Sequence, residues 1–217
     1  MQEQIQTKKT GTTTVGLVCK DCVIVGSESK STLGYLIASK EAQKVYVIDD
    51  RMAVTTAGSS GDSQALVRLI KAEINIYKLS RNNEITVNAT ATLLSNVLQS
   101  ARWYPYWAML ILGGVDSTGG HVYSIDPIGG TEEDKYTATG SGSPMAYGVL
   151  EDGFREGLTK DEGVRLAVRA IRSARERDIF SGGKDIVIAV IDKNGIELVD
   201  KDKIKECIEK RNEYIKQ

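Results

Sequence analysis

The sequence predicts an α+β fold: a four-layer α-β-β-α sandwich of two stacked, mostly antiparallel sheets flanked by helix pairs. Runs rich in β-branched residues alternate with amphipathic helical segments, in the order strands, two helices, strands, two helices, strands, helix. Grouped strands and grouped helices favour this packing over alternating βαβ units. The 217 residues contain no repeat and no linker, so we expect a single domain over residues 12–217.

The first elements are expected to be strands. Residues 1–11 are polar and are expected to precede the folded domain. Two β-rich runs, 12–19 and 23–29, flank a tight turn. Further short β-rich stretches lie within 33–49, and a strand at 51–58 ends at a glycine.

Two helices and a second group of strands follow. Residues 63–83 carry apolar side chains at helical spacing: Leu66, Leu69, Ile70, Ile74 and Tyr77. A second amphipathic segment runs from Val87 to about Arg102. Strands are then expected at 108–116 and 121–126. Between them and the helices lies an aromatic cluster, 103–107, which fits either core packing or a contact between subunits.

The last third repeats this order. Residues 139–154 begin as a loop of small residues and are expected to become helical after Pro144, because proline is favourable in a first helical turn. Residues 161–178 form a strongly amphipathic helix. The runs 186–192 and 196–199 flank an Asn-Gly turn and predict a hairpin, and a charged helix closes the chain.

The composition excludes several functional classes. The chain has 28 Lys and Arg against 29 Asp and Glu, a net charge of −1, and no basic stripe, so no nucleic-acid partner is expected. No run of about 18 apolar residues is present, so no membrane partner is expected. The polar N-terminus lacks the apolar region of a secretory signal, and we expect a cytoplasmic protein.

The spacing of Cys19 and Cys22 could suggest a zinc site or a redox motif. A structural zinc site needs four ligands, and the remaining soft candidates are Cys207 and the single His121. A redox motif of this spacing should open a helix, whereas Lys20 lies in a turn between β-rich runs. We therefore interpret the pair as strand residues and expect neither a metal nor a cofactor.

The segment around Thr12 could be an ordinary threonine-rich strand. Thr12 could instead be a nucleophile if it is a new N-terminus. The α-amine of Thr12, with a pKa near 8, could then serve as the base for the Thr12 hydroxyl. Such a site needs a lysine, a carboxylate to pair with it, and a backbone donor for an oxyanion. Lys44, Glu28 and Gly58 are the candidates, and Gly11 before the proposed scissile bond carries no side chain.

Six motifs carry a resemblance to proteasome β subunits over about residues 9–210. They are G-T-T-T-V-G from Gly11, E-x-K-x-T at 28–32, K-x-x-x-K at 40–44, A-G-S-S-G-D at 57–62, A-T-G-S-G-S-P at 138–144 and R-D-I-F-S-G-G at 177–183. No single motif is decisive, but their order and spacing together are specific.

The resemblance implies a role for each matching residue. Thr12 is the nucleophile, Lys44 tunes its amine, and Glu28 pairs with Lys44, where many members of the family have aspartate. Ser141, Asp178 and Ser181 match the polar network that supports the threonine, and the Gly58 N–H matches the oxyanion donor. The implied substrate cleft is mostly uncharged, and its positions are Ser31, Thr32, Ala42, Tyr46, Thr56, Ser60 and Gln64.

The implied function is that of a threonine endopeptidase, which cleaves itself between Gly11 and Thr12 to remove residues 1–11. Implied partners are other β subunits in a seven-membered ring, rings of α subunits, unfolded polypeptide substrates and, indirectly, a regulatory ATPase. Two alternatives are a structural β subunit that retains its propeptide, and another N-terminal-nucleophile amidohydrolase or HslV-type peptidase.

Overall fold

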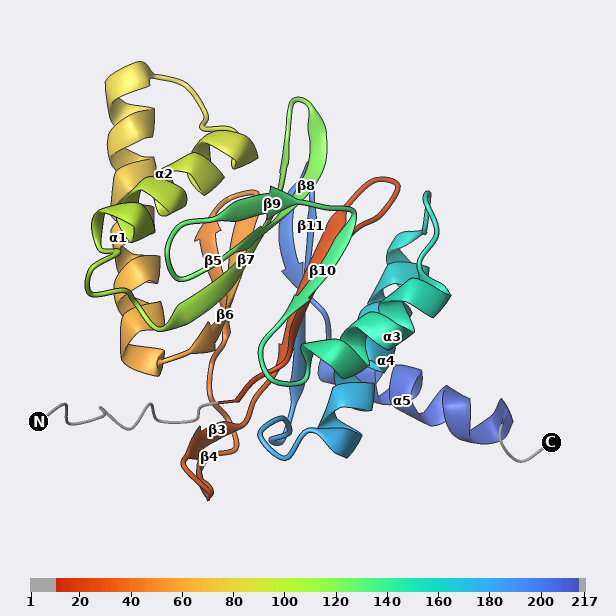
Figure 1. Ribbon diagram of the computed structural model, residues 1–217. Helices are drawn as coiled ribbons and strands as arrows, with labels where there is room; N and C mark the ends of the chain where they lie inside the picture. Colours follow the sequence, from red (N-terminus) through yellow and green to blue (C-terminus); the bar gives the residue numbers. More distant parts are fainter. Residues whose placement is uncertain (1–10, 215–217) are drawn as a thin grey trace, which may run out of the picture.

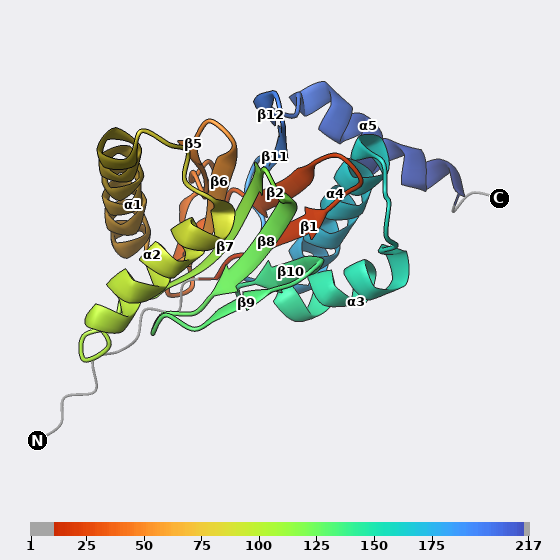
Figure 2. The same cartoon turned by 90° about the horizontal axis from the view of Figure 1, so that it is seen from above.

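The computed structural model describes the backbone of residues 11–214 and the side chains as far as residue 209. Helices α1 (Ser60–Arg81) and α2 (Val87–Ser100) cover one outer face of a pair of stacked sheets, and α3 (Ser143–Gly153) and α4 (Lys160–Arg177) cover the other (Figures 1 and 2). The predicted four-layer sandwich is confirmed. The expected propeptide falls almost entirely outside the described residues.

The first sheet contains β1, the first strand of the domain, as an inner strand. Its order is β10-β1-β2-β11-β12, and every neighbouring pair is antiparallel. The bounds are β1 Thr14–Val18, β2 Val23–Glu28, β10 Tyr136–Thr139, β11 Ile186–Asp192 and β12 Gly195–Leu198. Because β10 pairs with β1, the loop that follows β10 returns to the beginning of the domain.

The second sheet has the order β5-β6-β7-β8-β9 and is also antiparallel throughout. The bounds are β5 Val45–Asp49, β6 Met52–Gly58, β7 Ala108–Asp116, β8 Gly119–Ile125 and β9 Thr131–Glu133. A small separate hairpin, β3 (Ser31–Leu33) and β4 (Leu36–Ser39), projects below the sheets in Figure 1. The C-terminal helix α5 spans Lys201–Tyr214 and contacts α4.

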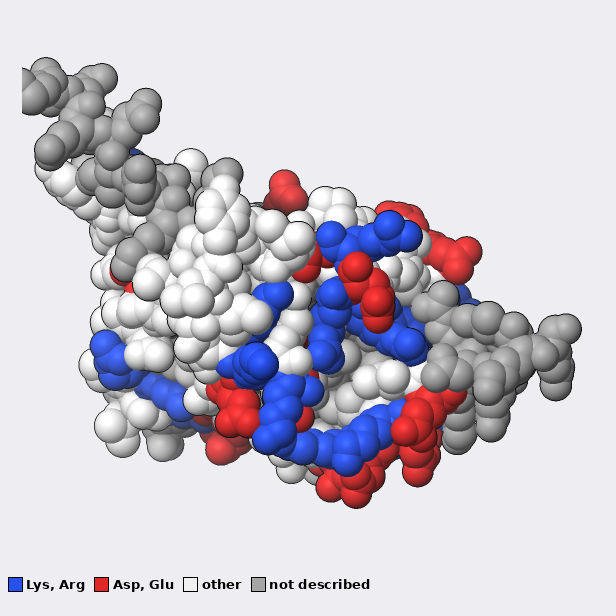
Figure 3. Space-filling model, turned by 90° about the horizontal axis from the view of Figure 1, so that it is seen from below, with Lys and Arg blue, Asp and Glu red and all other residues white. Residues whose placement is uncertain are grey.

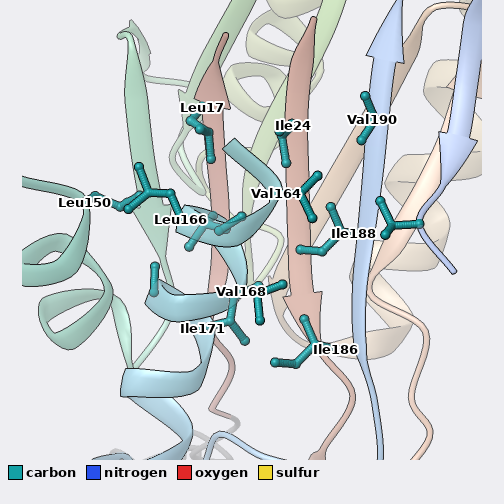
Figure 4. Close-up of a cluster of buried hydrophobic side chains, with 14 of the residues drawn as sticks. Leu17, Ile24, Leu150, Val164, Leu166, Val168, Ile171, Ile186, Ile188 and Val190 are labelled. Carbon is teal, nitrogen blue, oxygen red and sulfur yellow. The ribbon is translucent and has the colours of Figure 1, made fainter. Parts of the chain in front are cut away.

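Three apolar layers hold these elements together. One lies between the first sheet and α3, α4 and α5, where strand residues such as Ile24 and Ile188 meet Val164 and Ile171 of α4 (Figure 4). A second lies between the other sheet and α1 and α2. The third lies between the sheets. There Gly113 lets them approach closely, since a Cβ at this position would lie 2.5 Å from Val25 Cγ1.

Helix termini fix the positions of loops that matter for the site. The Ser59 hydroxyl caps α1 by accepting from the Asp62 N–H, immediately after β6 ends. Helix α4 begins with a reciprocal capping box between Thr159 and Glu162. It ends at Asp178, whose N–H donates to Ala174 O, so this carboxylate is held at a helix C-terminus.

Three details differ from or resolve the sequence analysis. Strands β9 and β10 were not predicted, because each is short and they lie in a polar segment. In the aromatic cluster the core interpretation is wrong for Trp103, Tyr104 and Trp107, which are 79%, 92% and 61% exposed. Cys19 and Cys22 are buried on either side of the β1–β2 turn, as predicted, but they lie one residue outside the two strands rather than within them.

The surface charge is mixed in sign. On the face seen from below, Lys and Arg are interspersed with Asp and Glu (Figure 3). Ion pairs at the surface include Lys184 with Glu41 and Lys201 with the partly buried Asp185. Among the helices that the structure describes, none combines the length and apolar character needed to cross a membrane.

Candidate active site

The ends of several strands meet at one edge of the two sheets. Thr12 and Thr13 precede β1, and Glu28 is the last residue of β2. The β1–β2 register pairs Thr14 with Ser27, so Thr13 lies opposite Glu28, whose N–H donates to Thr13 O at 3.4 Å. Lys44 directly precedes β5. This sheet geometry brings together residues that are up to 32 positions apart.

The Thr12 hydroxyl lies between a lysine and the peptide bond before it. Lys44 Nζ donates to Thr12 Oγ1 at 2.9 Å, and Thr12 Oγ1 donates to Gly11 O at 2.6 Å. Thr12 is buried, with 3% of its surface exposed. The hydroxyl oxygen is therefore held beside a carbonyl group and beside a cation.

Lys44 is paired with Glu28 through a direct contact between Nζ and Oε1, and both side chains are buried. Burial lowers the pKa of Lys44, and the adjacent Glu28 carboxylate counteracts part of this decrease. Backbone groups hold the carboxylate as well. Oε1 accepts from Thr13 N at 3.4 Å, and Oε2 accepts from Lys30 N at 2.6 Å and Gly182 N at 3.0 Å.

A second carboxylate, Asp178, organises hydroxyl groups on the other side of Thr12. Ser141 Oγ and Ser181 Oγ both donate to Asp178 Oδ2, at 2.5 and 2.6 Å. Ser141 Oγ in turn accepts from Thr12 N at 3.2 Å. Asp178 thus reaches the Thr12 nitrogen through Ser141.

Two glycines permit the close packing around Thr12. A Cβ at Gly11 would lie 1.8 Å from Phe180 Cβ. Gly140 has φ +90°, and a Cβ there would lie 2.1 Å from Thr12 O. The backbone on both sides of the threonine therefore leaves no room for a side chain at either position.

A cleft opens beside Thr12. Six of the seven positions predicted for substrate line it: Ser31, Thr32, Ala42, Tyr46, Thr56 and Ser60. Gly58 and Lys44 are also part of its wall, whereas Gln64 is not. Thr32 Oγ1 is buried without a hydrogen-bond partner in the described structure, so the cleft contains a polar group that a ligand could satisfy.

Gly58 ends β6 with φ +126°, and a Cβ at this position would lie 2.1 Å from the carbonyl oxygen of Trp107. Gly58→Ala is therefore expected to lower the free energy of unfolding by about 1–3 kcal/mol through backbone strain, with further loss from the clash. Gly61→Ala is the matched control, because the nearest atom to its Cβ would be 4.0 Å away. Urea unfolding of the two variants tests this, and equal midpoints would show that Gly58 is not restrained.

Residues that the sequence analysis did not identify also take part. Thr13 contacts Ser181 through its hydroxyl, Phe180 packs its side chain close to Gly11, and Gly182 donates its N–H to Glu28. None of these contacts follows a local sequence pattern, so no signal in the sequence indicated them. Within the described part of the chain, no three His, Cys, Asp or Glu side chains gather to form a metal site.

Comparison with known proteins identifies the family. Residues 8–191 match the sequence pattern of the proteasome subunit family, which is most of the chain. The chain belongs to the proteasome subunit family. The described site residues from Gly11 to Gly182 fall within the matched range, and so does strand β11 except for its last residue, Asp192.

Curated proteasome proteins from archaea align with nearly the whole chain. The "Proteasome subunit beta" of Methanoregula boonei is 52% identical over 211 residues, 97% of this chain and 99% of that protein. That of Ferroglobus placidus is 56% identical over 189 residues, 87% and 90% of the two chains. That of Methanocaldococcus jannaschii is 49% identical over 201 residues, 92% and 89%. The predicted resemblance to proteasome β subunits is confirmed.

Proposed function

We propose that this chain is a threonine endopeptidase subunit of a proteasome core particle, and that it activates itself by cleaving between Gly11 and Thr12. The observation that carries the proposal is the position of Thr12 Oγ1, 2.9 Å from Lys44 Nζ and 2.6 Å from Gly11 O. Similarity to proteins named proteasome subunit beta supports the same assignment.

Self-cleavage begins with attack by Thr12 Oγ on the carbonyl carbon of Gly11. Water takes the hydroxyl proton as the C–O bond forms, and the Gly11–Thr12 C–N bond breaks as that proton is passed on to the Thr12 nitrogen. Residues 1–11 are then joined to Thr12 Oγ as an ester, and water hydrolyses that ester. The products are a carboxylate on Gly11 and a free α-amine on Thr12.

The free amine then serves as the base for peptide substrates. It takes the proton of Thr12 Oγ as the hydroxyl attacks a substrate carbonyl, and it gives a proton to the leaving amine. Lys44, a cation nearby, favours the neutral form of the amine, and Glu28 keeps Lys44 in place. The Gly58 N–H stabilises the oxyanion, and water hydrolyses the resulting ester to regenerate the threonine.

The lining of the cleft supports a proposal for the residues after which the chain cleaves. This lining is mostly uncharged: of its two lysines, Lys44 is paired with Glu28 and Lys30 donates to Ile179 O. We therefore propose cleavage after neutral or apolar residues of unfolded polypeptides bound in an extended form, with backbone contacts at Thr32. The proposed setting is the cytoplasm, in a seven-membered ring of β subunits between α-subunit rings, with substrates delivered by a regulatory ATPase.

The test is the intact mass of the chain after assembly with α subunits of the same organism. The expected product begins at Thr12, and the expected particle cleaves fluorogenic peptides that end in an apolar residue. A particle that assembles but still carries residues 1–11 and is inert toward peptides would instead support the structural-subunit alternative.

A further inference from the structure

Thr13, the residue after the proposed nucleophile, contacts both halves of the site. Its N–H donates to Glu28 Oε1 at 3.4 Å, on the side of Lys44. Its hydroxyl lies 2.6 Å from Ser181 Oγ, on the side of Asp178. Thr13 is fully buried, so neither contact is replaced by solvent.

The donors in this network can be assigned. A hydroxyl has one hydrogen to donate. Ser181 Oγ donates its hydrogen to Asp178 Oδ2 at 2.6 Å, because an ionised carboxylate can only accept. The hydrogen between Thr13 and Ser181 must therefore come from Thr13 Oγ1. The chain of donors runs from Thr13 through Ser181 to Asp178, the same carboxylate that reaches Thr12 N through Ser141.

The space around this hydroxyl is closed. A Cβ at Gly142 would lie 2.0 Å from Thr13 Oγ1 and 3.1 Å from Ser181 Oγ. The hydroxyl is therefore held against Ser181 by the backbone of the loop that also carries Ser141. Few alternative rotamers remain for Thr13, so its hydrogen bond is constrained as well as buried.

We propose that Thr13 is a positioning residue, whose hydroxyl and N–H tie the Asp178 network to the Glu28–Lys44 pair and thereby hold the backbone of Thr12 in its reactive orientation. This inference rests on the proposed function, since it assigns Thr13 a task in the same reaction. Thr13 does not touch the substrate. Its effect passes through the covalent link to Thr12 and through the two carboxylates.

The test compares three variants of the full chain assembled with its α subunits. Thr13→Val removes the hydroxyl and keeps the shape, and Thr13→Ser keeps the hydroxyl. Thr14→Val is the matched control: Thr14 is equally buried, and its hydroxyl hydrogen-bonds Thr139 at 2.7 Å, outside the network. The readouts are the rate of appearance of chains that begin at Thr12, and kcat and KM for a fluorogenic peptide.

For Thr13→Val we expect about a tenfold loss in kcat and in the rate of self-cleavage, with KM changed by less than about twofold. Thr13→Ser should restore kcat, and Thr14→Val should leave kcat near that of the wild type. Wild-type kcat in Thr13→Val would overturn the inference, and so would equal losses in Thr13→Val and Thr14→Val. Peptidase activity that survives replacement of Thr12 by alanine would instead overturn the proposed function, so the two failures are distinguishable.

Discussion

Thr12→Ala is expected to leave residues 1–11 attached and to abolish peptide cleavage. Alanine removes the hydroxyl that we propose attacks both the Gly11 carbonyl and the substrate, and removal of a nucleophile typically reduces catalysis by about 10⁴-fold or more. The intact mass of the assembled chain should therefore correspond to the full precursor. The fluorogenic peptidase rate should fall to the background of an assay without enzyme.

Thr12→Ser is the matched variant, because it keeps the oxygen and loses only a methyl group. It should still begin at residue 12 after assembly and should retain measurable peptidase activity. Both variants should elute as the same particle in size-exclusion chromatography, since they change only the Thr12 side chain and keep its backbone contacts, such as the bond from Gly142 N to Thr12 O. A Thr12→Ala particle that cleaves peptides at the wild-type rate would eliminate the threonine mechanism.

Lys44→Met is expected to have the second-largest effect, on both activity and stability. Without the cation, the Thr12 hydroxyl loses a donor at 2.9 Å, and the buried Glu28 carboxylate is left without its counter-charge. Breaking a buried ion pair from one side typically costs about 3–5 kcal/mol. Urea unfolding should show that loss, and self-cleavage should stop.

The double variant Lys44→Met with Glu28→Gln separates the two effects. It removes both charges, so it should recover part of the stability while staying inactive. Lys184→Met serves as the surface control, because Lys184 pairs with Glu41 in an exposed position, and it should match the wild type in both assays. A Lys44→Met variant that still cleaves itself and peptides at the wild-type rate would show that the lysine has no chemical role.

The single variant Glu28→Gln is expected to change the pH dependence of kcat. Burial lowers the pKa of Lys44 and the Glu28 charge raises it, so loss of that charge lowers the Lys44 pKa further. If activity requires protonated Lys44, it is lost as pH rises through this pKa. The alkaline limb of the kcat profile should therefore move to lower pH in Glu28→Gln. If the alkaline limb of the kcat profile lies at the same pH in Glu28→Gln and wild type, the pKa of Lys44 does not determine that limb.

The sequence was sufficient to predict the layers, because long amphipathic segments such as 161–178 and the Asn-Gly hairpin carry strong periodic signals. It was insufficient for β9 and β10, which are three and four residues long and polar or mixed in composition. Strand β10 is held by its pairing with β1, a contact of more than 100 residues in sequence separation that no local pattern encodes.

The candidate site was likewise predicted from the sequence only in part. Thr12, Glu28 and Lys44 were nominated because the chemistry required a hydroxyl, a carboxylate and a cation. The contributions of Thr13, Lys30 and Gly182 could not be nominated that way, since their backbone N–H groups exist in almost every residue. Only the three-dimensional arrangement distinguishes these N–H groups from the rest.

The Glu28 carboxylate has a consequence for biosynthesis. It is oriented partly by Gly182 N, and the second carboxylate of the site is Asp178, so groups near the N-terminus depend on groups near the end of the domain. A ribosome makes Thr12, Glu28 and Lys44 early and Asp178 to Gly182 late. The nascent chain therefore lacks half of its reactive constellation until most of the domain has emerged. On the proposed function, we therefore expect an unfinished chain that carries Thr12 to be unable to cut itself or its neighbours during translation.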